Sequence, residues 1–282
     1  MSTILGVIVG VGMFGGMMTL PLLLQIVNGA TPTEAGFLML PMVAGMMTAS
    51  IVSGQVTSRT GKYKMFLISG TLFLTAGYLY MFTYRFDTPI WLVSIGMIVI
   101  GMGLGQLMQT LTLAAQNAVP AQDIGVATSS TTFFRQMGGT LGVAIFISIL
   151  FNSLPDKIAN AFKSTTYGDP FKQKAGEVMN GVMSGQIPVT DPNVVFLKSL
   201  QGGDTSKLGE MLNTDSSFLN DLDPELARPF LVGFSDAAVV VFECAAPVVT
   251  IAFILSFFVK AIPLRTKSAA EEKAAEMAAA SH

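Results

Sequence analysis

The sequence predicts an all-α membrane protein with six transmembrane helices and one long extracytoplasmic loop between the fifth and sixth helices. Hydrophobic residues make up 51% of the 282 residues, charged residues only 12%, and the mean hydropathy is +0.60. Soluble domains usually contain about 25% charged residues. The charges are also unevenly placed, because residues 1–150 contain only five basic and three acidic side chains. Membrane proteins concentrate their charges in loops in this way.

Each predicted span is an apolar segment long enough to cross a bilayer core about 30 Å thick, which takes roughly 20 helical residues. The spans are expected at about 4–27, 34–55, 65–83, 89–115, 125–151 and 233–262. Pro21 should kink the first of them. The chain therefore divides into helices one to five (1–151), a long loop with short helices (152–232), helix six (233–262) and a tail (263–282).

Basic residues in the short loops predict the orientation. They gather after span two and after span six, at Arg59, Lys62, Lys64, Lys260, Arg265 and Lys267, whereas the opposite short loops contain only Arg85. The positive-inside rule places both termini in the cytoplasm. The segment 152–232 then lies outside the cell, where patches at 158–162 and 177–183 predict short amphipathic helices. This segment is either a solvated cap or an element that gates the protein or binds a partner.

Several functional classes find no support in the sequence. The net charge of −2 and the pI near 5.4 do not suit a nucleic-acid-binding protein. Cys244 and His282 are the only cysteine and histidine, and no HExxH motif or pair of membrane aspartates occurs. We therefore expect no nucleic-acid partner, no metal site, no cofactor and no catalytic residues.

The loop after span two carries a motif of Gly54, Arg59, Gly61 and Lys62. Glycine permits a tight turn between antiparallel helices. Arg59 and Lys62 are expected to pair with carboxylates or with helix C-terminal carbonyls and so latch neighbouring helices. Alternatively, they are plain positive-inside anchors.

This loop resembles the second copy of the signature loop of the major facilitator superfamily: glycine, four residues, arginine, one residue, glycine and a basic residue. Ser58 stands where that motif usually has an acidic residue, which argues against a strong charge relay. Further segments follow in a characteristic order, at 20–25, 28–29, 101–105, 115–117, 125–129 and 134–142. Over residues 6–150 and the last span, the chain is similar to the C-terminal half of the fourteen-helix drug:proton antiporter branch, the multidrug efflux type.

The resemblance implies one half of a major facilitator fold in a bacterial inner membrane. It implies alternating access and proton-coupled efflux of drugs or other amphipathic small molecules. The family's proton-carrying carboxylates would lie in the other half, so the chain is expected to need an N-terminal partner bundle or to self-associate. An inactive truncated or split half and a non-transporting scaffold remain alternatives.

Arg135 lies about ten residues inside span five, where a lipid-facing arginine would cost roughly 3 kcal/mol. It shares a helix face with small residues, Thr128, Thr131, Thr132, Gly139 and Gly142. By resemblance, this span lies between the two halves. Arg135 is expected to link helices there or to meet substrate or a carboxylate, with Gln136 beside it. The alternative is a structural arginine satisfied by carbonyls or by Gln136.

Span four carries a polar stripe, Gln106, Gln109, Thr110 and Gln116 at helical spacing. Such a stripe is too costly to face hydrocarbon, so it should face the bundle interior or a cavity. By resemblance, this helix and span one with Gln25 line the substrate pathway. Ordinary hydrogen bonding between helices is the alternative. Gly101 and Gly105 predict a close helix contact.

Glu243 is the one carboxylate that the sequence places deep within a span, about ten residues into span six. Ionisable groups at such depth are functional candidates by default. Glu243 is therefore a proton-coupling candidate, and an ion pair or a position at the membrane boundary is the alternative.

Overall fold

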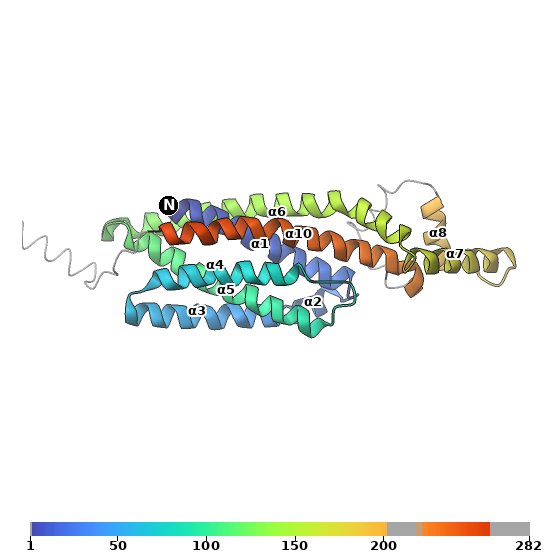
Figure 1. The fold of residues 1–282 in the computed structure, drawn as a ribbon, viewed down its shortest axis with the longest axis horizontal. Helices are drawn as coiled ribbons and strands as arrows, with labels where there is room; N and C mark the ends of the chain where they lie inside the picture. Colours follow the sequence, from blue (N-terminus) through green and yellow to red (C-terminus); the bar gives the residue numbers. More distant parts are fainter. Residues whose placement is uncertain (1, 202–218, 220–221, 260–282) are drawn as a thin grey trace, which may run out of the picture.

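The computed structural model describes residues 2–201, 219 and 222–259, which form a long helical bundle with a smaller helical cap at one end (Figure 1). The bundle helices and their bounds are α1 (Ser2–Ile26), α2 (Pro32–Leu38), α3 (Leu40–Thr60), α4 (Tyr63–Met81), α5 (Ile90–Asn117), α6 (Ile124–Lys163) and α10 (Pro224–Phe258). The cap contains α7 (Gly168–Met183) and α8 (Pro192–Gln201), and a short 3-10 turn (Ala121–Asp123) precedes α6. The predicted tail 263–282 and the basic residues Lys260, Arg265 and Lys267 lie outside the described residues.

A helix occupies each predicted span. Five segments are long and apolar enough to cross a membrane, namely Ile4–Ile26, Pro32–Thr60, Ile90–Asn117, Ile124–Lys163 and Pro224–Phe258. Helix α4 has 19 residues, begins with the polar Tyr63 and Lys64, and is not among these five. It nevertheless packs against both α5 and α10 within the bundle. The crossing of six helices therefore stays a prediction.

The second predicted span is broken into α2 and α3 by local sequence signals. Helix α2 starts with a capping box, in which Glu34 N donates to Thr31 Oγ1 (3.3 Å) and Thr31 N donates to Glu34 Oε2 (2.9 Å). Pro41 lies in the first turn of α3, where its missing N–H costs nothing. Pro41 has no N–H to donate to the carbonyl of Phe37 in α2, so the helix is interrupted and α3 begins at Leu40.

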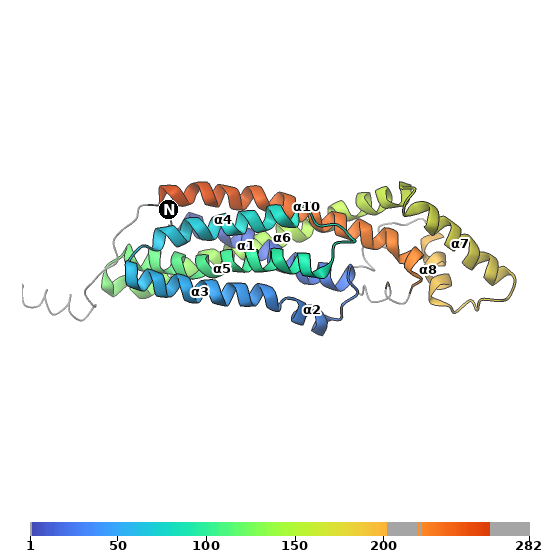
Figure 2. The ribbon, with the colours of Figure 1, turned by 60° about the horizontal axis from the view of Figure 1, so that its bottom comes forward.

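Helix α5 is the centre of one part of the bundle, with α3 on one side and α4 on the other (Figure 2). Glycines let the backbones approach closely. A Cβ on Gly101 would lie 2.1 Å from the Met42 carbonyl oxygen of α3, and one on Gly105 would lie 2.1 Å from that of Met46. The predicted close helix contact at these two glycines is confirmed, and Gly103 forms a similar contact with α4.

Helices α1 and α6 form the second close pair. A Cβ on Gly138 would lie 2.3 Å from the Val7 carbonyl oxygen, and one on Gly142 would lie 2.4 Å from that of Val11. The small-residue face predicted for this span therefore packs on α1 of the same chain. Tyr78 joins the two parts of the bundle, since its buried hydroxyl donates a hydrogen bond from α4 to the Gly12 carbonyl of α1. Its ring also stacks on Phe242 of α10.

The cap is built on extensions of α6 and α10. Helix α6 continues past Phe151 to Lys163, and α10 begins at Pro224, so both ends of the predicted loop 152–232 are helical. The patch at 158–162 belongs to α6, and the patch at 177–183 belongs to α7. A small apolar cluster joins α7, α8 and the start of α10 through Val178, Val194, Leu197 and Leu226.

Polar contacts fix the cap to the bundle. Lys174 Nζ lies 3.1 Å from Asp223 Oδ2, and this hydrogen bond and charge raise the pKa of Lys174. Asp223 also caps the start of α10. The Arg228 guanidinium lies over the rings of Phe86 and Tyr167, 5.9 and 5.8 Å from their centroids. Arg228 thereby connects the α4–α5 loop with the start of the cap.

We predict that Gly105→Ala destabilises the protein by about 1–3 kcal/mol, because the added methyl group overpacks a backbone contact. The matched control is Gly125→Ala, where a Cβ would meet nothing within 4 Å. Thermal unfolding in detergent, followed by circular dichroism, measures the difference. Equal melting temperatures for the two variants would contradict the close α3–α5 contact.

Candidate functional site

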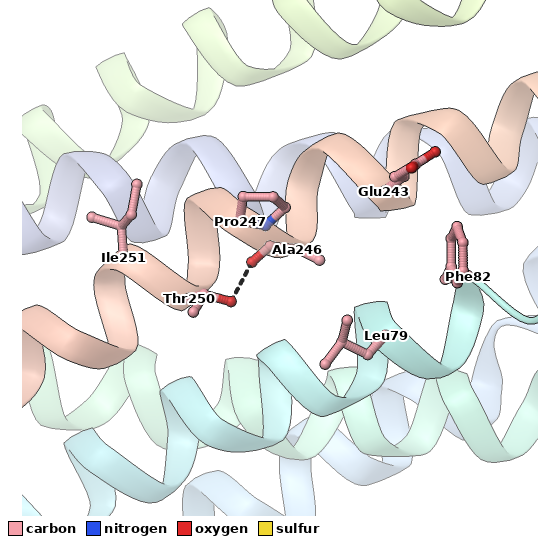
Figure 3. A pocket seen from close by; sticks show the side chains of 7 residues that line it. All are labelled: Leu79, Phe82, Glu243, Ala246, Pro247, Thr250 and Ile251. Atoms are coloured by element: carbon pink, nitrogen blue, oxygen red, sulfur yellow. Dashed lines mark hydrogen bonds between the residues drawn. The ribbon is translucent and has the colours of Figure 1, made fainter.

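Two grooves flank α4. The first lies between α3, α4 and α5 and has a volume of about 360 Å³. Its lining residues are mostly apolar, with two polar side chains from α3 and α5: Pro41, Ala44, Gly45, Thr48, Ala49, Val52, Phe66, Ile98, Met102 and Gln106. The second lies between α4 and α10, has a volume of about 520 Å³ and contains Glu243 (Figure 3). Both volumes suit small organic molecules.

The polar stripe of α5 is divided between the interior and the surface. Gln106 is only 6% exposed and accepts a hydrogen bond from Ser69 Oγ of α4, while it also lines the first groove. Thr110 is fully buried and donates to the Gln106 carbonyl (2.7 Å). Gln109 is exposed near Gly54 of α3. Gln116 donates to Thr128 of α6 (2.9 Å), which is hydrogen bonding between helices.

Gln25 lies near the end of α1 and is half-buried. Its side chain forms no hydrogen bond with a described residue, and it lines neither of the two grooves. Its place in a substrate pathway stays a prediction.

Arg135 has one buried side-chain nitrogen without a hydrogen-bond partner. The residue is half-buried, and its Nη1 atom is buried without a hydrogen-bond partner. No described Asp or Glu forms an ion pair with it. Gln136 is exposed and forms no side-chain hydrogen bond to Arg135 in the described part of the chain. The alternative in which carbonyls or Gln136 satisfy the arginine is therefore not what the structure shows at Nη1.

The glycine-rich motif forms the turn between α3 and α4. Gly61 ends α3 with φ +70°, and its N–H donates to the Thr57 carbonyl (2.8 Å). A side chain would strain this left-handed conformation, so the predicted glycine turn is confirmed at Gly61. Arg59 and Lys62 are exposed, and their side chains form no hydrogen bond or ion pair with a described residue. The expected latch is made instead by Lys64, whose Nζ donates to the Phe257 carbonyl of α10 (2.8 Å).

Glu243 is exposed and lines the second groove together with Phe82 (Figure 3). Phe82 directly follows the last residue of α4, so Glu243 lies level with the end of α4 that is nearer the cap. Its carboxylate forms no hydrogen bond and no ion pair with a described residue. Helix α10 begins at Pro224, nine residues before the expected start at 233, so Glu243 lies near the middle of this helix, and its level in the bundle is given by its neighbours on α4 and not by its distance from the helix start.

Residues that sequence reasoning missed are Ser69, Thr48 and Lys64. Ser69 and Thr48 are single polar residues within apolar spans, a weak signal that only their tertiary neighbours make meaningful. Lys64 was counted as a topology charge, and its contact with α10 joins residues 193 positions apart.

The model of the Major Facilitator Superfamily matches residues 2–143, which is half of the chain. The chain belongs to this superfamily. Members of the superfamily are membrane transporters and not enzymes, and the apolar helices, together with the bacterial relatives, agree with a multi-pass bacterial membrane protein.

Several relatives are similar to this superfamily member over most of its length. It is 31% identical to an uncharacterized MFS-type transporter of Mycobacterium tuberculosis over 93% of the chain and 32% of the relative. It is 29% identical to a tetracycline resistance determinant of Streptomyces rimosus (96% of the chain, 74% of the relative). It is also 29% identical to a multidrug transporter protein of Bacillus subtilis (98% and 48%). The chain thus spans from about a third to about three quarters of the length of these relatives.

We predict that Gln106→Leu lowers the free energy of unfolding by about 1 kcal/mol, because it removes the hydrogen bond to Ser69. Gln109→Leu is the matched control and should have little effect, since Gln109 is exposed. Thermal melts of Gln106→Leu, Ser69→Ala and the double variant measure the coupling between the two side chains. Additive effects would show that the Ser69–Gln106 bond does not contribute to stability.

Proposed function

We propose that this chain is the C-terminal six-helix half of a fourteen-helix, proton-coupled exporter of drugs or other amphipathic small molecules. In this proposal α4 crosses the membrane with the other five segments, and both termini lie in the cytoplasm. The cap of α7 and α8 then lies outside the cell. The chain would alternate access by rocking against a second bundle.

The observation that carries this proposal is the unsatisfied Arg135. Burying one nitrogen of a charged guanidinium without a hydrogen-bond partner is costly, and a second bundle would offer a partner. Arg135 would meet a carboxylate of that bundle or an anionic group of the substrate. Its carbonyl oxygen lies against Gly10, so the close α1–α6 contact fixes the position of its backbone.

The uneven coverage of the helices supports a second bundle. In the most apolar stretch of each segment, 22% of the residues are buried for α2–α3 and 33% for α6. The corresponding share is 56% for both α1 and α5. Exposed side chains on α6 include both apolar and polar ones: Phe133, Gln136, Met137, Thr140, Leu141 and Ile145. A face that mixes polar with apolar groups suits contact with another helix or a cavity better than contact with lipid.

The groove between α3, α4 and α5 supports an amphipathic substrate. Its wall is largely apolar, and Gln106 and Thr48 offer polar contacts without charge. Gln109 and Gln25 would extend the pathway in the assembled transporter. The curated relatives named for multidrug transport and for tetracycline resistance agree with this substrate class.

Proton coupling would come mainly from carboxylates of the other half. Glu243 is poorly placed for a central role, because it is exposed at the level of the end of α4. Arg59 and Lys62 would anchor the α3–α4 turn at the cytoplasmic surface, as basic loop residues do.

A second candidate is a half that is inactive without its partner. The relatives favour it, since the chain covers only 48% of the Bacillus subtilis transporter and 32% of the Mycobacterium tuberculosis protein. A self-associated transporter and a non-transporting scaffold are the remaining alternatives.

Dye efflux tests these functions. The chain is expressed in cells that lack their own exporters, alone and together with an N-terminal half from a relative, after membrane insertion has been verified. We expect uncoupler-sensitive efflux from the pair, and a reduction of at least about tenfold for Arg135→Ala, corresponding to the loss of one charge-assisted contact. The matched control is Arg85→Ala in an exposed loop.

Efflux by the chain alone would show that it self-associates and needs no partner half. If the inserted pair transported nothing, the chain would be a scaffold and the proposal would fail. Unchanged efflux in Arg135→Ala would remove Arg135 from the mechanism, while leaving transport itself established.

A further inference from the structure

The groove between α4 and α10 has a distinct chemical character. Five of its seven lining residues have apolar side chains: Leu79, Phe82, Ala246, Pro247 and Ile251. Thr250 donates its hydroxyl proton to the Ala246 carbonyl of its own helix (2.7 Å), so it offers the groove only oxygen lone pairs (Figure 3). Glu243 contributes a carboxylate that forms no hydrogen bond or ion pair with a described residue. The lining side chains thus present acceptors and no free donor.

Pro247 adds a further acceptor beside Glu243. Proline has no N–H, so it cannot donate to the carbonyl four residues earlier in the helix, which is that of Glu243. Glu243 therefore carries two acceptors, its charged carboxylate and a backbone carbonyl that lacks its usual helical donor. Glu243 and Pro247 both line the groove (Figure 3). Two acceptors beside each other, one of them charged, match a donor with a positive charge.

The groove also has room for an apolar body. Its volume is about 520 Å³, within the range of small-molecule sites. Glu243 lies near one end, and Thr250 and Ile251 lie about 10 Å further along α10, taking 1.5 Å per residue. The walls between them are aliphatic or aromatic. An elongated molecule with a charged head and an apolar tail fits this distribution.

We propose that the α4–α10 groove binds a lipophilic ammonium ion, with its N–H groups at the carboxylate and carbonyl of Glu243 and its apolar chain along Leu79, Pro247 and Ile251. This site lies on the opposite side of α4 from the groove that contains Gln106. Its occupant reaches it from the apolar phase around the bundle, since the groove opens between two outer helix surfaces. Binding here does not depend on a second bundle or on transport.

A free ammonium amphiphile fits better than an aminophospholipid. The headgroup of such a lipid carries a phosphate next to its ammonium, and a phosphate requires a cation or several hydrogen-bond donors. No Lys or Arg lines the groove, and its polar side chains offer only acceptors. The phosphate would therefore lie unpaired beside the Glu243 carboxylate.

Binding of radiolabelled decylammonium to the whole chain in phosphatidylcholine nanodiscs tests the site, with binding to empty nanodiscs subtracted. We expect Glu243→Gln to weaken binding by about tenfold or more, because it removes the charge while keeping the shape. Glu243→Asp should retain most of the binding. The matched control is Asp236→Asn, which removes an exposed carboxylate of α10 outside the groove lining.

Two further comparisons separate the parts of the site. Decyltrimethylammonium has no N–H group and should bind several-fold more weakly than decylammonium. That difference should shrink in Pro247→Ala, because the new N–H can occupy the Glu243 carbonyl. Melting temperatures of all variants identify any loss of binding that comes from unfolding. If Glu243→Gln is unfolded, Glu243→Asp tests the role of the carboxylate in a folded protein.

The proposal is overturned if Glu243→Gln binds as tightly as the parent chain, or if Asp236→Asn weakens binding equally. It is also overturned if neutral decanol displaces the probe as effectively as decylammonium. Displacement by phosphatidylethanolamine, introduced in place of part of the phosphatidylcholine, would assign the groove to lipid headgroups instead. Because the assay measures binding alone, its outcome is independent of whether the chain exports anything.

Discussion

Close backbone contact through glycine is the constraint on which the rest of this bundle depends. In a membrane, lipid tails are as apolar as the side chains, so packing and not hydrophobic burial must hold helices together. Gly101 and Gly105 place α5 against carbonyls of α3, and Gly138 and Gly142 place α6 against carbonyls of α1. A single methyl group at these contacts would have to displace a helix. The positions of Gln106 and Arg135 follow from these contacts.

The helices α3, α4 and α5 form one glycine-packed group, and α1 and α6 form the other. A small number of hydrogen bonds connects these two groups. The Tyr78 hydroxyl reaches the Gly12 carbonyl, and Gln116 reaches Thr128. Each such bond is worth only about 1 kcal/mol, so together they set register more than they set stability. Arg135 differs, because one of its nitrogens is buried without a partner while α6 remains largely uncovered. The bundle is thus well packed in its interior and incompletely matched along α6.

The grooves beside α4 show how one helix can separate two chemical environments. On one side, Gln106 lies in a mostly apolar wall and is already bonded to Ser69. On the other side, Pro247 and Glu243 leave acceptors without donors in the described structure. Helix α4 contacts α3 little, which leaves the first groove open, and the second groove lies beside the contact between α4 and α10. A groove lined by an uncharged amide and a groove that contains a carboxylate therefore flank the same helix.

The sequence by itself determined the helices, because apolar segments of about 20 residues have few alternatives in a bilayer. It also predicted the Gly61 turn and the Gly101–Gly105 contact, since both depend on local geometry that only glycine supplies. Tertiary structure alone decided which charges matter: Lys64, not Arg59 or Lys62, contacts α10, and Glu243 lies level with the end of α4. It also decided that Gln106 is inside and Gln109 outside. These outcomes depend on which helices become neighbours, and that pairing joins residues too distant in sequence for any local pattern to specify.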